Sequence, residues 1–379
     1  MNVLISSGFR WWNAEAAYAA TLAELLREAG HGVWVLAPSG TPNAERLGAL
    51  GLEPIGSIRP GHPNPLRWPG ELRKLADLQL RHRIDVVDAF HPADYLLHVR
   101  AARRTPGLRV FLTRGGAQTE RNTWLNRKLY GPWCDGVVTS CEAIRSRLHE
   151  RLGLPLEGFH TIYYPTDLPE LAPPEERRGQ RERFLGELGF GPERFVIGVV
   201  GRIAPEKGHD RLIEAMARLS VNHPEALLLI LNKGNASEPP LRQRLERHIR
   251  ERGLERHTVW LGFRKDVAQV VGWLDVGAIP SVDSELNCRV AVEFMAAGTP
   301  IVAFPTGALP EVVEDGVSGL LTPDHSPEVL AGALERLAAD RNLLARLAEG
   351  AREQAERRFS KAGFLRATLD VFESAGGRG

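Results

Sequence analysis

The chain has 379 residues, which exceeds the size of one ordinary hydrophobic core and suits two domains. Its hydrophobic content of 43% and charged content of 25% are those of a globular protein, and its net charge of +1 disfavours a dedicated nucleic-acid binder. No apolar run approaches the roughly 18 residues that a membrane span needs.

Short β-rich runs alternate with helical patterns along the first half, which is typical of a parallel α/β sheet. A helix should begin after Asn13 as its cap and end near Gly30. The strands expected here are residues 2–8, 31–38, 85–91, 109–114, 136–140 and 160–165. Proline and charged residues then dominate 165–180, which indicates a linker that we place at 171–190.

The same alternation restarts in the second half. The strands expected here are residues 194–202, 226–231, 258–263, 276–281 and 300–304. Residues 326–359 show helical periodicity, and 359–379 hold a last helix with an apolar stripe. The sequence therefore predicts two doubly wound, Rossmann-like α/β domains, 1–170 and 191–358. Ligands of such sheets bind at the carboxyl ends of strands, so the loops after the strands are the candidate sites.

The loop after the first strand, SSGFRWWNAE, contains one glycine instead of the pattern G-x-G-x-x-G. The second strand ends Leu36-Ala37-Pro38, without the acid that would bind a ribose. Both features disfavour a nicotinamide-dependent oxidoreductase.

The segment GRIAPEKG, 201–208, follows a buried strand and opens a helix. Gly201 allows close backbone approach, and Arg202 and Lys207 place two cations beside helix amides that favour anions. This arrangement suits a pyrophosphate. A surface turn with two solvated cations is the alternative interpretation.

Two acids, Glu285 and Glu293, are separated by eight residues around the start of a helix expected at 287–297. Apolar neighbours surround Glu293 in the sequence, so we expect a buried carboxylate that needs partners such as the two hydroxyls of a ribose. The alternative is a structural ion pair with Arg289, four residues earlier.

The segment 304–321 follows the strand 300–304. Its residues Thr306-Gly307-Ala308 lead into a helix with Pro310 near the start. Backbone amides at Gly307 could hold a phosphate or a sugar. An ordinary connection between strand and helix would look the same.

In this order, the three segments resemble the retaining glycosyltransferases of family 4, which have the GT-B fold. Arg202 and Lys207 match the cation pair of that family, and Glu285 and Glu293 match its E-x7-E motif. Gly307 with Glu311 matches its last element, a turn from a glycine to a glutamate. The resemblance covers most of the second half and is looser in the first half, where it includes DVVDAFH with His91.

The resemblance implies two domains that face each other across a cleft, with a nucleotide-sugar donor held by the second. Glu285 would contact the donor sugar, Glu293 the ribose, and the base would lie near Arg264. The last helix would cross back to the first domain. The donor-binding residues implied are Gly201, Arg202, Lys207, Arg264, Glu285, Leu286, Asn287, Glu293 and Gly307.

This sequence departs from the family pattern at two places. Leu286, Asn287 and Cys288 stand where the family usually has glycines, so the sugar pocket could differ in shape. Where many members have a catalytic-site His, this chain has Arg114, in a TRG segment like that of bacterial envelope-glycan enzymes. Arg114 and His91 are therefore the first-domain candidates for the catalytic site.

The expected reaction transfers a sugar from a nucleotide sugar, whether UDP-, GDP- or ADP-linked, to a glycan or lipid-linked acceptor with retention of configuration. Arg202 and Lys207 would stabilise the leaving diphosphate, which would accept the proton of the acceptor. No Asp-x-Asp occurs, so we expect no metal and no further cofactor. An epimerase, a phosphorylase or a non-catalytic sugar-nucleotide-binding subunit of the same fold are the alternatives.

Acceptor binding is expected in the loop Gly8, Arg10, Trp11 and Trp12, although both tryptophans could equally be core or lid residues. The basic helix at 66–83 could rest on the inner membrane or could simply be solvated. Three cysteines without metal-ligand spacing and an N-terminus unlike a signal peptide predict a cytoplasmic location.

Overall fold

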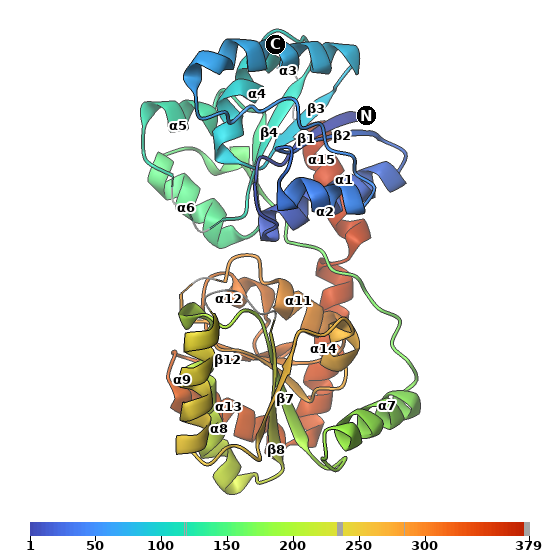
Figure 1. The fold of residues 1–379 in the computed structure, drawn as a ribbon, viewed down its shortest axis with the longest axis vertical. Coiled ribbons are helices and arrows are strands. Elements are labelled where there is room, and N and C mark those ends of the chain that lie inside the picture. The colour runs from blue at the N-terminus through green and yellow to red at the C-terminus, as the bar shows by residue number, and fades with distance from the viewer. Residues whose placement is uncertain (117, 119, 233–237, 284, 375–379) are drawn as a thin grey trace. The chain divides into compact units, whose positions relative to one another are not determined.

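The computed structural model describes residues 1–116, 118, 120–232, 238–283 and 285–374. The chain divides into two compact units: unit 1 comprises Met1–Tyr164 and the C-terminal segment from Lys361 onward, and unit 2 comprises Pro165–Ser360. The described residues of each unit form a six-stranded parallel sheet with flanking helices (Figure 1). The prediction of two doubly wound α/β domains is confirmed.

The sheet of unit 1 has the strand order β2-β1-β3-β4-β5-β6. Its strands are β1 Asn2–Ser6, β2 Gly32–Leu36, β3 Val86–Ala89, β4 Arg109–Arg114, β5 Gly136–Thr139 and β6 Phe159–Thr161. Ser6 is in register with both Leu36 and Ala89, so β1, β2 and β3 end at one level. The loops that follow these three strands therefore meet at one edge of the sheet.

The helices of unit 1 include one that comes from the far end of the chain. They are α1 Ala14–Glu28, α2 Pro42–Ala49, α3 Trp68–Arg81, α4 Tyr95–Ala102, α5 Trp124–Leu129, α6 Glu142–Leu152 and α15 Lys361–Ser374, with short 3-10 turns η1 Pro65–Arg67, η2 Pro92–Asp94 and η3 Leu156–Gly158. Phe364 and Phe372 of α15 are buried, with ring centroids 5.0 Å from Tyr18 and 4.8 Å from Phe111 respectively. Helix α15 thus completes the core of unit 1.

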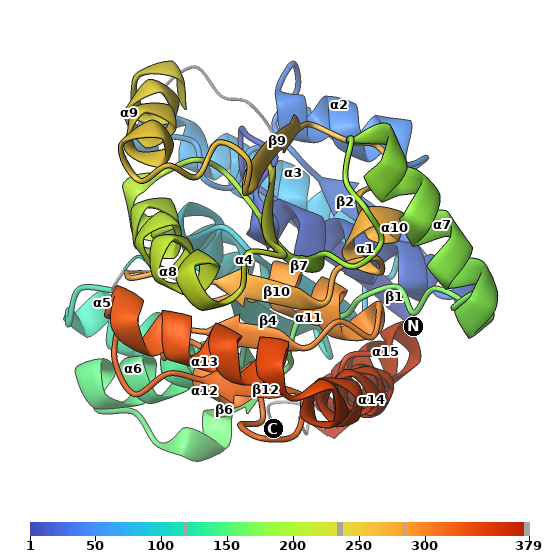
Figure 2. The ribbon, with the colours of Figure 1, turned by 90° about the horizontal axis from the view of Figure 1, so that it is seen from below.

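The sheet of unit 2 has the strand order β12-β11-β10-β7-β8-β9, part of which is labelled in Figure 2. Its strands are β7 Phe195–Val200, β8 Ala226–Leu231, β9 Thr258–Gly262, β10 Val276–Ile279, β11 Ile301–Ala303 and β12 Gly319–Leu321. Its helices are α7 Pro174–Glu187, η4 Pro205–Lys207, α8 His209–Asn222, α9 Glu238–Glu251, α10 Val267–Val271, α11 Arg289–Ala296, α12 Leu309–Val312, α13 Pro327–Ala339 and α14 Arg341–Arg358.

Three local expectations differ from the structure. The segment 171–190, expected as a linker, contains helix α7, whose Phe184 and Leu185 are buried. The helical stretch 326–359 is two helices, because Asp340 is extended and its side chain caps α14 through Asn342 N and Leu343 N. Strand β12 was not expected, and it is only three residues long.

Among the described helices, none is both long and apolar enough to cross a membrane.

Candidate active site

Two loops of unit 2 meet at the topological switch of its sheet. Strand β7 is followed by the loop 201–208 and β10 by the loop 280–288. These strands are neighbours in the sheet, although β8 and β9 lie between them in sequence. Helix α8 begins after the first loop and α11 after the second. Open α/β sheets bind ligands at such a switch, where strand ends and helix amino ends converge.

Lys207 and Glu285 form an ion pair between these two loops. Lys207 Nζ lies 2.5 Å from Glu285 Oε2, and Ser281 Oγ donates a hydrogen bond to the same oxygen at 2.9 Å. The Lys207 and Glu285 side chains are 24% and 12% exposed, so water screens the pair only in part. Sequence reasoning assigned both ionic residues to one site and missed Ser281, whose only signal is its place at a strand end.

Two glycines allow the loops around this pair to pack closely. A Cβ at Gly208 would lie 1.9 Å from Pro280 O, and a Cβ at Gly307 would lie 2.5 Å from Glu285 O. Both residues have a positive φ, 64° and 60°, where residues with a side chain are strained. Ala308 N also donates to Glu285 O at 2.8 Å. The loop after β11, which contains Gly307, therefore fixes the backbone of Glu285.

A buried hydroxyl supports the loop that carries Ser281. Thr306 Oγ1 donates to Ser281 O at 2.5 Å and lies 2.9 Å from His325 Nε2. Because the hydroxyl proton goes to the carbonyl, His325 donates its Nε2 proton to Thr306. Arg211 in turn donates to His325 O at 2.7 Å. No sequence motif pointed to His325, because its role depends on contacts between distant loops.

Glu293 lies on helix α11 and is not buried as expected. Its side chain is 40% exposed and its Oε1 lies 3.7 Å from Arg289. The helix is short and buries Ala291, Val292 and Met295, which leaves Glu293 at its partly open side. Desolvation raises the pKa of Glu293, and the nearby Arg289 opposes that rise. The ion pair that we weighed as an alternative is thus present.

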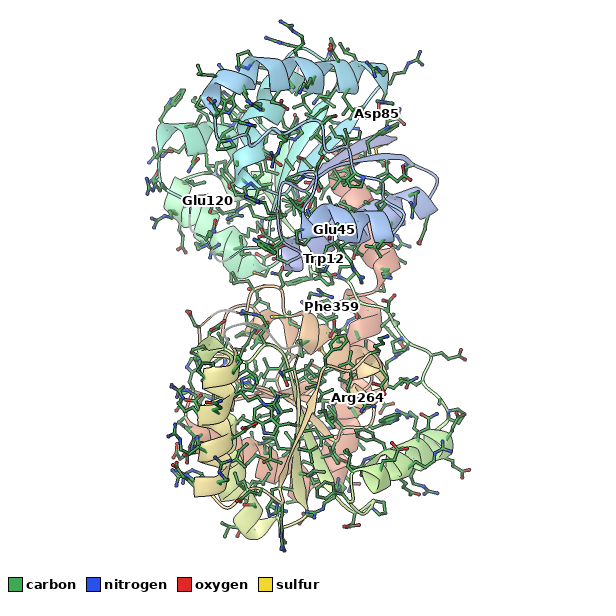
Figure 3. All side chains as sticks on the ribbon, in the orientation of Figure 1. Trp12, Glu45, Asp85, Glu120, Arg264 and Phe359 are labelled. Atoms are coloured by element: carbon green, nitrogen blue, oxygen red, sulfur yellow. The ribbon has the colours of Figure 1, made fainter. Side chains whose placement is uncertain are left out.

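Two other predicted donor-site cations form ion pairs of their own. Arg202 donates to Glu206 Oε1 at 3.0 Å and its side chain is 62% exposed. Arg264, labelled in Figure 3, donates to both carboxylate oxygens of Asp266, at 2.8 and 2.5 Å. The neighbouring Phe263 follows β9 with its ring 65% exposed. Among the described residues, neither arginine bonds to Lys207 or Glu285.

One of the residues that replace the family's glycines keeps a backbone conformation that glycine favours. Leu286 and Asn287 are half-buried, whereas Cys288 is buried and has a φ of 44°. This left-handed conformation favours glycine and strains a residue with a side chain by roughly 1 kcal/mol or more. The backbone therefore follows a glycine-type path to the start of α11, although the side chains differ.

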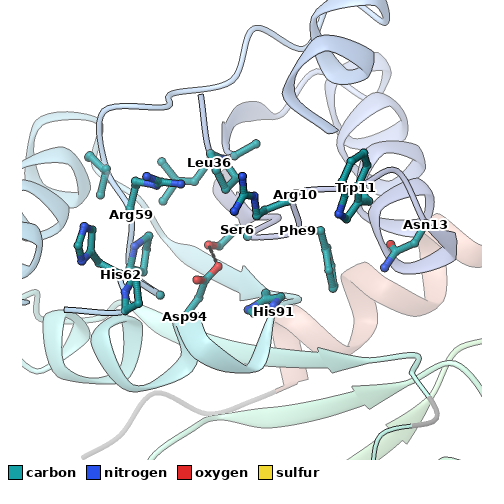
Figure 4. A pocket seen from close by; sticks show the side chains of 17 residues that line it. Ser6, Phe9, Arg10, Trp11, Asn13, Leu36, Arg59, His62, His91 and Asp94 are labelled. Atoms are coloured by element: carbon teal, nitrogen blue, oxygen red, sulfur yellow. Dashed lines mark hydrogen bonds between the residues drawn. The ribbon is translucent and has the colours of Figure 1, made fainter. Parts of the chain in front are cut away.

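In unit 1, the loop after β1 lines a cavity of about 550 Å³, shown in Figure 4. Gly8, Arg10 and Trp11, predicted on the acceptor side, line this cavity, as does His91 after β3. Trp12 packs instead against the core of unit 1, with Arg46 over its ring at 5.8 Å. For Trp12 the structure agrees with the alternative of a core residue.

Asp94 is a buried carboxyl in the wall of this cavity. It is 2% exposed and accepts a hydrogen bond from Ser6 Oγ at 2.8 Å. Burial raises the pKa of Asp94 to about 7, which the Ser6 hydroxyl and the backbone N–H groups of Gly61 and Gly8 oppose. Sequence reasoning missed this residue, because the 3-10 turn η2 that carries it has no motif.

Arg114 is the centre of a buried ion-pair network and not an open cation. Its side chain is 2% exposed and lies 2.6 Å from Glu120 and 3.4 Å from Glu15. Tyr130 also donates to Glu120, at 3.1 Å, and Gly115 N donates to Glu15 at 3.1 Å. Two carboxylates thus neutralise the guanidinium, which disfavours Arg114 as a free cation for a leaving phosphate.

Two family models match the chain, one in each half. The model described as "Glycosyltransferase Family 4" matches residues 16–169, and the model described as "Glycosyl transferases group 1" matches residues 180–354. Together they span nearly all of both sheets.

Curated relatives match over part of their length. A D-inositol 3-phosphate glycosyltransferase of Jonesia denitrificans is 32% identical over 225 residues, 58% of this chain and 52% of the relative. A protein of the same name from Saccharomonospora viridis is 37% identical over 247 residues, 64% of this chain and 56% of the relative. The matches thus span about half the length of these relatives.

Solved structures match over almost the whole chain. A glycosyltransferase from Rickettsia africae has a TM-score of 0.86 at 18% identity, with coverage of 99% of this chain and 98% of the other. Anabaena Alr3699/HepE in complex with UDP has a TM-score of 0.84 at 22% identity, with coverage of 99% and 100%. At these identities the likeness establishes the fold.

Proposed function

We propose a donor site and a reaction for this chain, which belongs to the family 4 glycosyltransferases with the GT-B fold. In this proposal the enzyme transfers a sugar from a nucleoside diphosphate sugar to a hydroxyl group of an acceptor, with retention of the anomeric configuration. The ion pair between Lys207 and Glu285 at the switch of the second sheet is the observation that carries the proposal.

The geometry of this pair supports separate roles for its two residues. Oε2 of Glu285 accepts hydrogen bonds from Lys207 and Ser281. Oε1 has no hydrogen-bond partner among the described residues, so it can accept a hydrogen bond from a hydroxyl of the donor sugar. The ammonium of Lys207 has three N–H groups and donates one of them in a hydrogen bond to Glu285, so two N–H groups remain for diphosphate oxygens. Lys207 would thus hold the diphosphate and Glu285 the sugar.

The chemistry requires charge stabilisation and no protein nucleophile. As the bond between sugar and diphosphate breaks, negative charge grows on the phosphate oxygens that Lys207 and the amino end of α8 would face. The exposed Arg202 would be a second cation at the phosphate, once its hydrogen bond to Glu206 is replaced by one to a phosphate oxygen. The leaving phosphate would accept the proton of the acceptor hydroxyl on the same face of the sugar, which gives retention without a metal.

The nucleoside would bind further along the same edge of the sheet. Glu293 is open enough to accept hydrogen bonds from two ribose hydroxyls, provided that Arg289 moves from its position at 3.7 Å. The exposed ring of Phe263 could stack on the base beside Arg264. Uracil is the first base to test, because Anabaena Alr3699/HepE, a solved structure of the same fold, is in complex with UDP.

The acceptor would bind in unit 1, where the loop Gly8–Trp11 lines the cavity. A glycan or a lipid-linked sugar fits the envelope-type sequence features, whereas the names of the curated relatives point to an inositol phosphate. We also propose a cytoplasmic enzyme with peripheral contact to the membrane through a basic surface that contains Arg73 of α3 and Arg100 and Arg104 at the end of α4.

Kinetics of matched variants test the donor site. Lys207→Ala should lower kcat about a hundredfold, as loss of one charge-stabilising donor does, and Glu285→Gln should impair turnover as well. Lys128→Ala, a lysine of α5 in unit 1, is the control and should retain wild-type turnover. The assay follows release of nucleoside diphosphate from UDP-, GDP- and ADP-sugars, and NMR reads the anomer of the product.

Unchanged turnover of Lys207→Ala would contradict the proposed site. An inverted product would contradict retention alone. Conversion of the donor sugar without any acceptor would favour the epimerase alternative.

A further inference from the structure

The cavity of unit 1 lies at the topological switch of its own sheet. Strand β1 sits between β2 and β3, and the chain reaches β3 only after it has formed β2 on the other side. The loop after β1, the segment 58–63 and the turn after β3 close around a space of about 550 Å³. All three segments belong to unit 1, so the cavity is defined within that unit.

The lining of this cavity is strongly basic. Arg10 and Arg59 both line it, and their side chains extend into the space between their loops in Figure 4. Both residues are exposed, and neither guanidinium has an ion pair or hydrogen bond with any residue that the structure describes. The exposed Arg178 of α7, by contrast, lies 3.8 Å from Glu182, four residues further along the same helix.

Two histidines add donors to the same wall. Nδ1 of His62 accepts the N–H of Asn64 at 3.0 Å, and Nδ1 of His91 accepts the N–H of Ala93 at 3.2 Å. An imidazole whose Nδ1 accepts must carry its proton on Nε2, so each ring has one N–H left to donate. The N-cap of α1, Asn13, also lines the cavity, which brings the positive end of that helix to its edge.

The acid in the wall offsets only part of this charge, because one carboxyl faces two guanidinium groups and burial raises its pKa to about 7. The carboxylate of Asp94 accepts the hydroxyl of Ser6 and the backbone N–H groups of Gly8 and Gly61. A Cβ at Gly8 would lie 2.4 Å from Asp94 and one at Gly61 would lie 2.6 Å from it. Asp94 thus ties together the loops that carry Arg10 and Arg59 and fixes both arginines beside one space.

We propose that this cavity binds the phosphate group of a phosphate-bearing alcohol, with Arg10 and Arg59 as the principal ligands and the Nε2 protons of His62 and His91 as additional donors. A phosphate offers three terminal oxygens and up to two charges, which matches two forked guanidinium groups better than one carboxylate would. That the alcohol is the sugar acceptor rests on the proposed function, whereas the phosphate site rests on the cavity alone.

Calorimetric binding to the full chain tests the proposal with D-inositol 3-phosphate and unphosphorylated inositol as probes. The phosphorylated compound should bind at least tenfold more tightly. Arg10→Gln and Arg59→Gln should each weaken its binding by about tenfold to a hundredfold, the usual effect of losing a charge-assisted hydrogen bond. The control Arg81→Gln removes an exposed arginine of α3 in the same unit and should leave binding unchanged, while equal melting temperatures show that all variants fold.

A second arm distinguishes a free phosphate ester from a lipid headgroup. Phosphatidylcholine vesicles with phosphatidylinositol 4-phosphate, whose headgroup carries a phosphate monoester, are compared with the soluble ester. Binding that depends on Arg10 and Arg59 in either arm supports the site, and the arm in which it occurs identifies the source of the phosphate. Equal affinity for both soluble probes with no vesicle binding that depends on these arginines overturns the proposal. Binding of UDP to the same variants should be unchanged. The UDP measurement therefore tests the donor site of unit 2 separately from the phosphate site of unit 1.

Discussion

At the scale of single residues, Asp88 shows how burial couples this fold to pH. It lies in the centre of β3, is 1% exposed and accepts a hydrogen bond from Thr113 Oγ1 at 2.7 Å. Desolvation raises the pKa of Asp88 to about 7 from an ordinary value of 3.8, and the hydroxyl of Thr113 opposes this rise only in part. The folded state therefore holds the proton more tightly than the unfolded chain.

This difference predicts that stability falls as pH rises. The favourable contribution is fully present below about pH 4 and is lost as pH rises through the folded pKa near 7. Asp88→Asn keeps the shape and accepts the same hydrogen bond without a charge. We expect that the wild type loses about 2 to 3 kcal/mol more unfolding free energy than Asp88→Asn between pH 5 and pH 8, measured by urea unfolding.

The control for this prediction is Asp77→Asn, an exposed acid of α3. It should follow the wild-type curve. If the curves of Asp88→Asn and the wild type run parallel, the proposed linkage to Asp88 is wrong.

The candidate donor site shows which residues a sequence can and cannot assign. Lys207 and Glu285 lie 78 positions apart, yet both follow strands whose ends meet at one edge, so their proximity could be predicted from topology. Ser281 and His325 could not, because nothing local marks a side chain whose role is to support another loop. Glu293 was wrongly expected to be buried, since apolar neighbours in sequence lie on a different side of α11.

At the scale of elements, helix α3 and its neighbour α4 form a basic surface on unit 1. A groove of about 610 Å³ between them is lined by Trp68, Leu72 and Arg73 of α3 and by Arg100 and Arg104 at the end of α4. Leu66, just before α3, is 88% exposed. Arginines around exposed apolar side chains are typical of helices that rest on an anionic membrane.

This surface predicts that binding to vesicles depends on charge. The double variant Arg100→Gln with Arg104→Gln should bind vesicles of phosphatidylglycerol roughly thirtyfold more weakly, because each arginine near such a surface contributes about 1 kcal/mol. Vesicle sedimentation at low and high salt measures the effect.

The test needs a control variant and has one contradicting outcome. Arg250→Gln, an exposed arginine of α9 in unit 2, is the control and should bind as the wild type does. Equal binding of the wild type to phosphatidylglycerol and phosphatidylcholine would show that the surface is merely solvated.

The ends of elements were the least predictable part of the fold. Helix α1 could be predicted to its cap, because Asn13 Oδ1 accepts the N–H of Ala16 at 2.8 Å and Gly30 follows with a positive φ. Helix α7 could not be predicted, because its sequence is highly polar. Its two buried residues, Phe184 and Leu185, depend on packing in the folded unit. Strand β12 is only three residues long and is formed by pairing with β11.

At the scale of the whole molecule, the repeated alternation of strands and helices was enough to predict two doubly wound sheets. The strand orders within them were not predicted, because periodicity carries no information on which strands are neighbours. The sequence of α15 itself showed an apolar stripe, and the family resemblance implied that this helix returns to the first domain. The buried rings of Phe364 and Phe372 explain the stripe as part of the first core. The chain thus builds its first unit from both of its ends.

The most direct test of the central claim is a crystal structure of the protein with a bound nucleotide sugar. The distance from Lys207 Nζ to the nearest diphosphate oxygen is then measured. We predict a hydrogen bond of about 3 Å, with a hydroxyl of the donor sugar on Glu285 Oε1. A nucleotide sugar bound away from the loops 201–208 and 280–288 would contradict the account.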